Sequence, residues 1–148
     1  MISVEQKSEK IMNEDAVKAF PDECCGFMYG TEDASGNRVV TESLPINNGA
    51  VENRRRRFEI SPKDYLKGEQ HALENGLLFL GIYHSHPNHP AIPSEHDRVA
   101  AQPYFSYVIL STYDGVIKNT RSWRLNDDFQ FEEEEYSSPL KDSNKTIQ

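Results

Sequence analysis

Two stretches of the chain carry apolar residues at the spacing of amphipathic helices. In residues 5–20 they recur every three or four positions, and Pro21 ends the run because proline cannot continue a helix. A second helix is predicted to begin at Ser61-Pro62-Lys63-Asp64, which combines a serine cap, a proline in the first turn and an early carboxylate. Gly76 suits the end of this helix. We expect its buried face to consist of Tyr65, Leu66, Ala72 and Leu73.

The remaining apolar runs are short and predict β-strands. The expected strands are residues 25–29, 38–44, 58–60, 77–83, 104–111 and 116–125. Pro45 is expected to end the second of them, and Asp114-Gly115 is a turn sequence that joins the last two. Residues 84–93 hold three prolines, which predicts a loop before a short helix at residues 94–101. Helices mixed with strands in this order predict one α/β or α+β domain.

The composition is that of a globular protein with an acidic end. Of 148 residues, 36% are hydrophobic and 27% are charged, which fits one soluble domain. The net charge is −8, and much of the acidic excess follows residue 126, including Glu132–Glu135. We therefore expect a folded domain over residues 1–131 and a flexible acidic tail over residues 132–148. The acidic bias argues against nucleic acid as the main partner.

The apolar runs, the N-terminus and the cysteines are the parts of the sequence that bear on cellular location. The chain shows no apolar run of the ~20 residues that a membrane helix needs, and no secretory signal at its N-terminus. Its two cysteines, Cys24 and Cys25, are adjacent, a spacing that rarely forms a disulfide. These observations predict a cytoplasmic protein. We expect both thiols to pack as small apolar groups, although the residues alone leave a nucleophilic cysteine open.

The histidines of the proline-rich segment have the spacing of a metal site. His84 and His86 stand two residues apart, so both imidazoles face one side if the strand continues through them. With Asp97 as an oxygen ligand they predict a Zn²⁺ site, although iron and cobalt accept the same ligands. Three protein ligands leave one position for water, which is typical of a catalytic site. Glu23 is the candidate base for that water, and Ser94 can donate to a developing oxyanion.

Each part of this pattern also has an ordinary structural explanation. A His-x-His pair alone is common on protein surfaces. Ser94-x-x-Asp97 has the spacing of a helix capping box. Arg54–Arg57 suit a solvated loop, and they also suit a site for an acidic carrier surface or for a substrate's terminal carboxylate. The combination of the five candidate residues, rather than any one of them, favours a metal site.

The full pattern resembles the JAMM (MPN+, JAB) zinc metalloprotease family. It consists of His84-Ser85-His86-Pro87, then Asp97 ten intervening residues after the second histidine, Ser94 three positions before it, and Glu23 in an upstream Pro-Asp-Glu-Cys-Cys-Gly segment. The resemblance covers roughly residues 5–125. It implies a mixed β-sheet flanked by helices, similar to cytidine deaminases. It also implies zinc ligands at His84, His86 and Asp97, a general acid/base at Glu23 and an oxyanion donor at Ser94.

This short chain resembles the stand-alone prokaryotic members of that family, which act on sulfur-carrier proteins of the ubiquitin fold. The resemblance implies hydrolysis of the amide bond after the C-terminal Gly-Gly of such a carrier, with release of an amino acid or a short extension. Two alternatives stay open: an isopeptidase that acts like a deubiquitinase, and a non-catalytic module that binds a ubiquitin-like protein. A zinc deaminase is disfavoured because the chain lacks Cys-x-x-Cys.

Overall fold

One mixed sheet runs through the protein, in the strand order β7-β6-β5-β4-β2-β3-β1-β8. The structure is a computed structural model, and it describes residues 1–140. The strands are β1 (Ile2–Val4), β2 (Cys25–Glu32), β3 (Arg38–Ile46), β4 (Leu78–Pro87), β5 (Ser106–Tyr113), β6 (Val116–Leu125), β7 (Phe131–Glu134) and β8 (Tyr136–Ser137). The helices are α1 (Gln6–Ala19), α2 (Pro62–Asn75) and α3 (Glu95–Ala100). Because β4 pairs in parallel with β5 and antiparallel with β2, the predicted mixed sheet with helices is confirmed.

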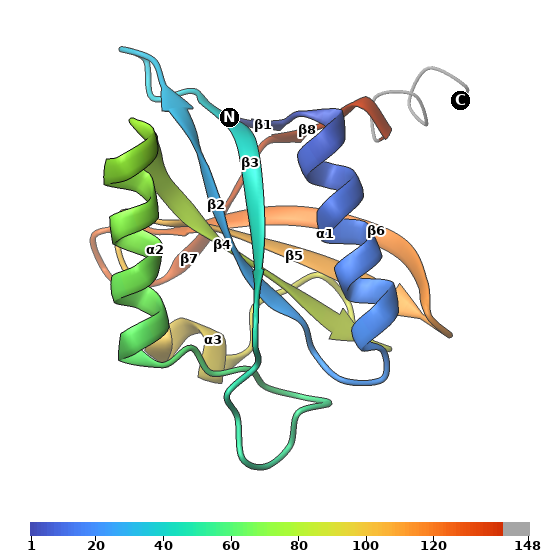
Figure 1. The fold of residues 1–148 in the computed structure, drawn as a ribbon. Coiled ribbons are helices and arrows are strands. Elements are labelled where there is room, and N and C mark those ends of the chain that lie inside the picture. The colour runs from blue at the N-terminus through green and yellow to red at the C-terminus, as the bar shows by residue number, and fades with distance from the viewer. Residues whose placement is uncertain (141–148) are drawn as a thin grey trace.

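The two long helices, α1 and α2, cover opposite faces of this sheet (Figure 1). Alternate residues of β2 serve the two faces: Met28 shares an apolar cluster with Met12 of α1, whereas Phe27 and Tyr29 share one with Ala72 of α2. The central strands are therefore buried on both sides, which explains why their sequences are nearly continuous apolar runs. In residues 1–140, no helix combines the length and the apolar character needed to cross a membrane.

The ends of α2 lie where the sequence predicts them, and of its predicted buried face Ala72 is buried and Tyr65 packs against the same apolar cluster. The Ser61 hydroxyl accepts the N–H of Asp64, and Gly76 closes the helix in the left-handed conformation. Leu66 is 57% exposed and Leu73 is 83% exposed, so the prediction that both are buried is wrong.

The two buried residues of α2 are small: Gly68, which was not predicted, and Ala72, which was. Gly68 packs against the ring of Phe27, where a Cβ atom would lie 2.6 Å from Cε2. The Gly68 carbonyl accepts the hydroxyl of Tyr29 at 2.9 Å, and Ala72 is buried one turn further on. Because the helix approaches the sheet along this line of small residues, its larger leucines turn to solvent.

β4 continues through part of the segment that we expected to be a loop. It extends to Pro87, which still lies opposite Thr112 of β5. The loop prediction is wrong for residues 84–87 because a proline is accepted where a strand ends, since its missing N–H removes no further ladder bond. The extension places both histidines on a central strand.

Two smaller strand predictions are also wrong. β3 runs through Pro45, which we expected to end it. β1 pairs only with residues 38–40 of β3, so Pro45 has β2 as a neighbour on one side and no strand on the other. Proline is tolerated at such an edge position. Residues 58–60 form no strand and belong to the loop that connects β3 to α2.

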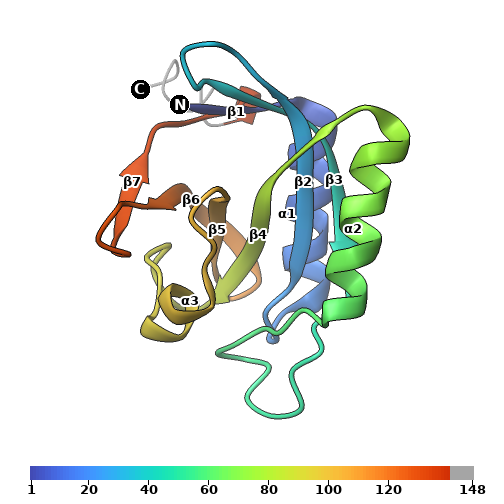
Figure 2. The ribbon, with the colours of Figure 1, turned by 90° about the vertical axis from the view of Figure 1, so that its left-hand side faces the viewer.

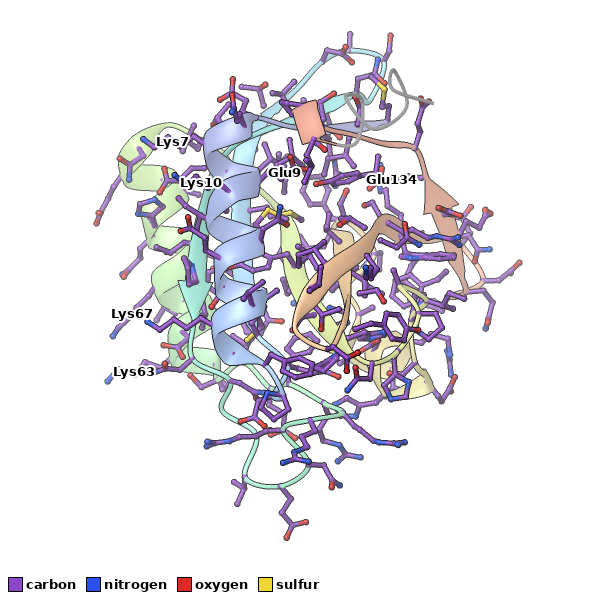
Figure 3. All side chains as sticks on the ribbon, turned by 90° about the vertical axis from the view of Figure 1, so that its right-hand side faces the viewer. Lys7, Glu9, Lys10, Lys63, Lys67 and Glu134 are labelled. Carbon is purple, nitrogen blue, oxygen red and sulfur yellow. The ribbon has the colours of Figure 1, made fainter. Side chains whose placement is uncertain are left out.

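Residues 131–137, most of which we expected to lie in a flexible acidic tail, form two short strands. β7 pairs with β6, and β8 pairs in parallel with β1. Tyr136 of β8 is buried, and its hydroxyl donates to Glu9 at 3.1 Å. Figure 3 shows Glu9 on the inner side of α1, whereas the exposed Lys7 and Lys10 lie on its outer side. Residues 141–148, the rest of the expected tail, lie outside the described residues.

A buried arginine joins the starting ends of the central strands. Arg38 of β3 is 1% exposed, and it donates to the Leu80 carbonyl at 3.1 Å and to the Ser106 hydroxyl at 2.9 Å. It also donates to the Tyr104 carbonyl at 2.8 Å and to the Glu32 carboxylate at 2.8 Å. The guanidinium is therefore paired on several sides, as a buried cation requires.

Candidate metal centre

Both histidines project from the second half of β4 toward the same side. Their Nε2 atoms lie 3.2 Å apart, as the alternation of side chains along a strand allows. His84 is 1% exposed and His86 is 6% exposed. The ring of Phe58 lies against that of His84, with the ring centroids 4.5 Å apart. The strand thus brings together the two imidazoles that the sequence spacing pairs.

Asp97 reaches the histidines from the first turn of α3. Its Oδ2 atom lies 3.3 Å from Nε2 of His84 and 3.1 Å from Nε2 of His86. The same oxygen accepts the N–H of Ser94 at 2.9 Å, while the Asp97 N–H donates to the Ser94 hydroxyl at 3.0 Å. The capping box is therefore present, and it aims the carboxylate at the imidazoles. A cap and a ligand role do not exclude one another.

The three facing atoms form a triangle whose size suits a metal ion. With metal–ligand distances of about 2.0–2.2 Å, two ligands of a tetrahedral zinc ion lie about 3.3–3.6 Å apart, close to the separations seen here. The separations among His84, His86 and Asp97 are 3.1–3.3 Å. Nδ1 of His86 lies 2.8 Å from the Pro90 carbonyl, and a proton at Nδ1 leaves Nε2 with the lone pair that a metal binds. The donor set and its spacing therefore fit a divalent cation such as zinc.

Glu23 faces the imidazoles from the segment just before β2. A carboxylate oxygen of Glu23 lies within 4.8 Å of ring nitrogens of His84 and His86. Its backbone is fixed by the loop, since its N–H donates to the Arg54 carbonyl at 2.6 Å and its carbonyl accepts Nδ2 of Asn48 at 3.1 Å. Its Oε1 atom is buried and has no hydrogen-bond partner within residues 1–140. A buried oxygen left unpaired is unfavourable, and this one indicates a group held ready for a ligand.

Burial and neighbouring charges set different protonation states in this cluster. Complete burial lowers the pKa of His84, which favours the neutral imidazole that binds metals. Burial acts to raise the pKa of Asp97, but its interactions with His84, its contact with His86 and the Ser94 N–H outweigh burial, so this pKa lies well below its ordinary value. Burial, helped by the Asp97 carboxylate, raises the pKa of Glu23 to about 9. An ionised carboxylate thus lies beside one that holds its proton.

Two clefts meet at the cluster. The first has a volume of about 440 Å³, and Glu23 and Ser94 line it. The second has a volume of about 370 Å³, and His84 and Asp97 line it. His96 lines both clefts. An extended chain laid across the cluster therefore has a place on either side of it.

The structure brings together the five side chains that the sequence singles out, and it adds others. The sequence missed Phe58 against His84, Asn48 behind Glu23, the Pro90 carbonyl at His86, and His96 between the clefts. These residues come from loops or from a helix start, and they share no local spacing with the motif. Only the fold places them at the site.

The adjacent cysteines do not provide an alternative nucleophile. Cys24 and Cys25 are buried and free. Burial raises the pKa of Cys25 to about 12, with a smaller contribution from Asp15, and burial also raises the pKa of Cys24. Because the thiolate is the reactive form, these thiols are poor nucleophiles. Their packing as small apolar groups agrees with the prediction.

Residues 5–126 match the family described as prokaryotic homologs of the JAB domain. The chain belongs to this family. Among curated relatives, a desampylase from Haloferax volcanii is 36% identical over 92 residues, which are 62% of this chain and 63% of the relative. The CysO-cysteine peptidase of Mycobacterium tuberculosis is 34% identical over 115 residues, which are 72% of this chain and 70% of the relative.

Other relatives share shorter stretches. A protein from Thermus thermophilus described as a probable TtuB-protein conjugate cleaving protease is 37% identical over 82 residues, 55% of this chain and 54% of the relative. The chain spans 63% of the Haloferax desampylase and 49% of a desampylase from Pyrococcus furiosus. The curated relatives are therefore peptidases or conjugate-cleaving enzymes that this chain matches in part.

Solved structures agree with the fold. The solution structure of a protein from Desulfitobacterium hafniense has a TM-score of 0.80 and 31% identity, and the match covers 93% of this chain and 92% of that one. A JAB1/MPN domain protein from Archaeoglobus fulgidus has a TM-score of 0.59 and 18% identity over 92% of this chain and 97% of that one. The second likeness supports the fold alone. Together with the family match, these structures confirm the JAB/MPN fold that the resemblance implied.

Proposed function

We propose that this protein is a zinc-dependent peptidase of a ubiquitin-like sulfur carrier. It hydrolyses the amide bond after the carrier's C-terminal Gly-Gly and releases an amino acid or a short extension. The observation that carries the proposal is the convergence of two imidazoles and one carboxylate at 3.1–3.3 Å, beside the unpaired carboxylate oxygen of Glu23. Apolar packing alone does not require such a set of converging polar atoms, so their presence supports a functional role.

In the proposed mechanism His84, His86 and Asp97 hold the zinc ion. When bound, zinc polarises the scissile carbonyl and makes a bound water acidic near neutral pH. The chain's own residues do the rest. The Nδ1 contact of His86 with the Pro90 carbonyl orients its ring, and the capping box orients the Asp97 carboxylate.

Glu23 moves the proton in this mechanism. Its carboxylate accepts a proton from the attacking water and donates it to the departing amine nitrogen. A positive charge beside Glu23 favours the ionised form of its carboxyl group, which is the form that a base needs. The position of Glu23 at the wall of the first cleft, next to the ligand triangle, supports this role.

Ser94 stabilises the oxyanion that forms as water attacks the carbonyl. Its oxygen already accepts the Asp97 N–H, and a hydroxyl that accepts one bond still has its own hydrogen to donate. Ser94 also lines the first cleft. A well-placed oxyanion donor is worth about 10²–10³ in turnover.

The substrate class is supported by the curated relatives. One is a CysO-cysteine peptidase, and another is a probable TtuB-protein conjugate cleaving protease. Both names describe cleavage of a bond to a carrier or conjugated protein, and we assign to the present chain a ubiquitin-like carrier, the substrate class that the family resemblance implies. The two buried, free cysteines fit the cytoplasm, which is the compartment that we propose.

The test uses zinc-loaded protein and CysO that carries one additional residue after its final glycines. We expect mass spectrometry to show loss of that residue, and a chelator to abolish the reaction. Glu23→Gln should lower turnover by about 10²–10⁴ while the zinc content stays the same. Glu74→Gln, at an exposed position of α2, is the matched control and should leave turnover unchanged. Full activity of Glu23→Gln would show that the base is misassigned.

Isopeptide cleavage is the second candidate function, because one relative is described as cleaving TtuB–protein conjugates. A TtuB chain joined to a lysine side chain is the probe. Cleavage of this conjugate faster than the extended CysO would favour the isopeptidase. Tight carrier binding without turnover of either probe would favour a non-catalytic module.

A further inference from the structure

The loop that joins β3 to α2, residues 47–61, lies on the same side of the molecule as α3 and the end of β4 (Figure 1, Figure 2). It carries Arg54–Arg57, four of the 16 Lys and Arg residues in a chain of net charge −8. Arg56 and Arg57 line the 440 Å³ cleft together with Glu23, and this cleft is called the arginine cleft below. The arginine run is therefore part of the wall of the site.

Hydrogen bonds fix this loop relative to Glu23. Nδ2 of Asn48 donates to the carbonyls of both Glu23 and Arg57, at 3.1 Å in each case. The N–H groups of Arg56 and Arg57 both donate to the carbonyl of Asn53 at 2.9 Å. The backbone that carries the two arginines is thus held in a set position beside the acid.

The arginine side chains keep their charge available. Within the described part of the chain, no ion pair with a carboxylate involves Arg55, Arg56 or Arg57. A guanidinium in a cleft offers its paired N–H donors to an anion, and a carboxylate matches their geometry. The arginine cleft is therefore suited to a carboxylate.

The position of Glu23 indicates which half of a substrate lies in the arginine cleft. A general acid must reach the departing nitrogen, and Glu23 lines the arginine cleft but is absent from the described lining of the second cleft. That second cleft includes Phe58, Tyr65 and Tyr107, and its described lining contains no Lys or Arg. The acyl half of the substrate therefore lies in the aromatic cleft, and the leaving residue lies in the arginine cleft.

We infer that Arg56 and Arg57 bind the free α-carboxylate of the leaving residue, so that the enzyme selects carriers that end shortly after their glycine pair. The inference rests on the proposed function. In a leaving group of one residue, the carboxylate carbon is two bonds from the amine nitrogen. A group that binds this carboxylate must therefore lie in the same cleft as Glu23, which donates the proton. Both arginines lie in that cleft.

The chemistry of the step stays balanced with this assignment. Hydrolysis breaks the bond between the glycine carbonyl carbon and the leaving nitrogen. Water supplies the new oxygen of the glycine carboxylate. Glu23 takes one proton from that water and passes it to the leaving nitrogen, and the proton lost from the new carboxyl group makes the released amine an ammonium group. The α-carboxylate keeps its charge throughout. A lysine-linked conjugate brings no carboxylate to this position, so the arginines favour release of a free amino acid over isopeptide cleavage.

The experiment compares two probes that differ in one group. CysO extended by one alanine is prepared with a free C-terminal carboxylate and with a carboxamide, and kcat/KM of the zinc-loaded enzyme is measured on each by mass spectrometry. We expect the carboxylate probe to be preferred by about tenfold or more. In the variant with both Arg56→Gln and Arg57→Gln, the preference should fall to about one.

Arg55→Gln is the matched control. It removes a charge from the same run, but Arg55 lines a neighbouring hollow and not the arginine cleft, so the tenfold preference should persist. Equal cleavage of acid and amide by the unaltered enzyme overturns this inference alone, as does a preference that survives in the double variant. Failure to cleave either probe with zinc bound overturns the proposed function and this inference together.

Discussion

Two buried polar clusters lie at opposite ends of β4, and they differ in how completely their atoms are paired. At the start of the strand, Arg38 makes four hydrogen bonds and lies 4.4 Å from the centroid of the Tyr104 ring. At the end of the strand, Oε1 of Glu23 and Nδ1 of His84 have no partner within residues 1–140. The central side chains of both clusters are buried: Arg38 and His84 are each 1% exposed, and Glu23 is 4% exposed.

The difference separates a cluster that stabilises the fold from one that is set up for a ligand. A buried polar atom without a partner costs about 1–3 kcal/mol, so a fold under selection for stability alone avoids it. The Arg38 cluster meets this requirement with neighbouring strand carbonyls and side chains. In the Glu23 cluster, buried polar atoms stay without hydrogen-bond partners, at the point where two clefts meet. The unpaired oxygen of Glu23 points to function because it coincides with the ligand triangle and with a cleft.

The largest expected effect is loss of the paired cluster. Arg38→Met should lower the free energy of unfolding by about 3–5 kcal/mol, because Leu80 and Tyr104 carbonyls and the Glu32 carboxylate lose their donor. Urea unfolding measures this change. Arg121→Met, at a partly exposed position, is the control and should change stability by less than about 0.5 kcal/mol. The zinc affinity of the folded Arg38→Met protein should stay the same. A lower zinc affinity would show that the Arg38 cluster and the Glu23 cluster do not have separate roles.

The next effect is on metal binding alone. Asp97→Asn keeps an oxygen that can accept the Ser94 N–H but removes the charge that faces the histidines. We expect zinc affinity to fall by more than about a hundredfold, since even groups that only orient ligands are worth 10–100-fold. Competition with a chromophoric chelator measures this. Unchanged zinc affinity would mean that Asp97 serves only as a helix cap.

The smallest effect is expected at Ser94, and it sharpens the distinction between cap and catalyst. Ser94→Ala should lower turnover by about a hundredfold through loss of the oxyanion donor, and stability by about 1 kcal/mol through loss of the cap. Zinc affinity should change by less than about tenfold. Stability and turnover are measured on the same sample. A change in stability with normal turnover would leave Ser94 only a structural role.

Much of this site was predictable because its motif is written in local spacing. The two-residue interval of His84 and His86 places them on one face of a strand, and the three-residue interval of Ser94 and Asp97 begins a helix. Both signals depend only on backbone periodicity. Local spacing therefore predicted His84, His86, Ser94 and Asp97, and the helix ends at Ser61 and Gly76, whereas Glu23, distant in the sequence, was assigned through the family resemblance.

What escaped prediction depends on how distant segments meet. Hydrophobicity placed Leu66 and Leu73 inside, but the close approach of Gly68 to Phe27 turned them outward. The acidic composition of residues 132–137 predicted a flexible tail, but these residues form β7 and β8 because they pair with β6 and β1. Arg38 gave no sign of burial, because its partners come from β4, β5 and the loop before β5. Periodicity does not encode such pairings.

One oxygen of Asp97 belongs to two structures at once. Oδ2 accepts the N–H that starts α3, and it is also a corner of the ligand triangle. A helix of six residues is too short to persist on its own in water. The start of α3 and one corner of the ligand triangle are therefore fixed by the same atom, so the residue that orients this turn also sets the geometry of the cluster.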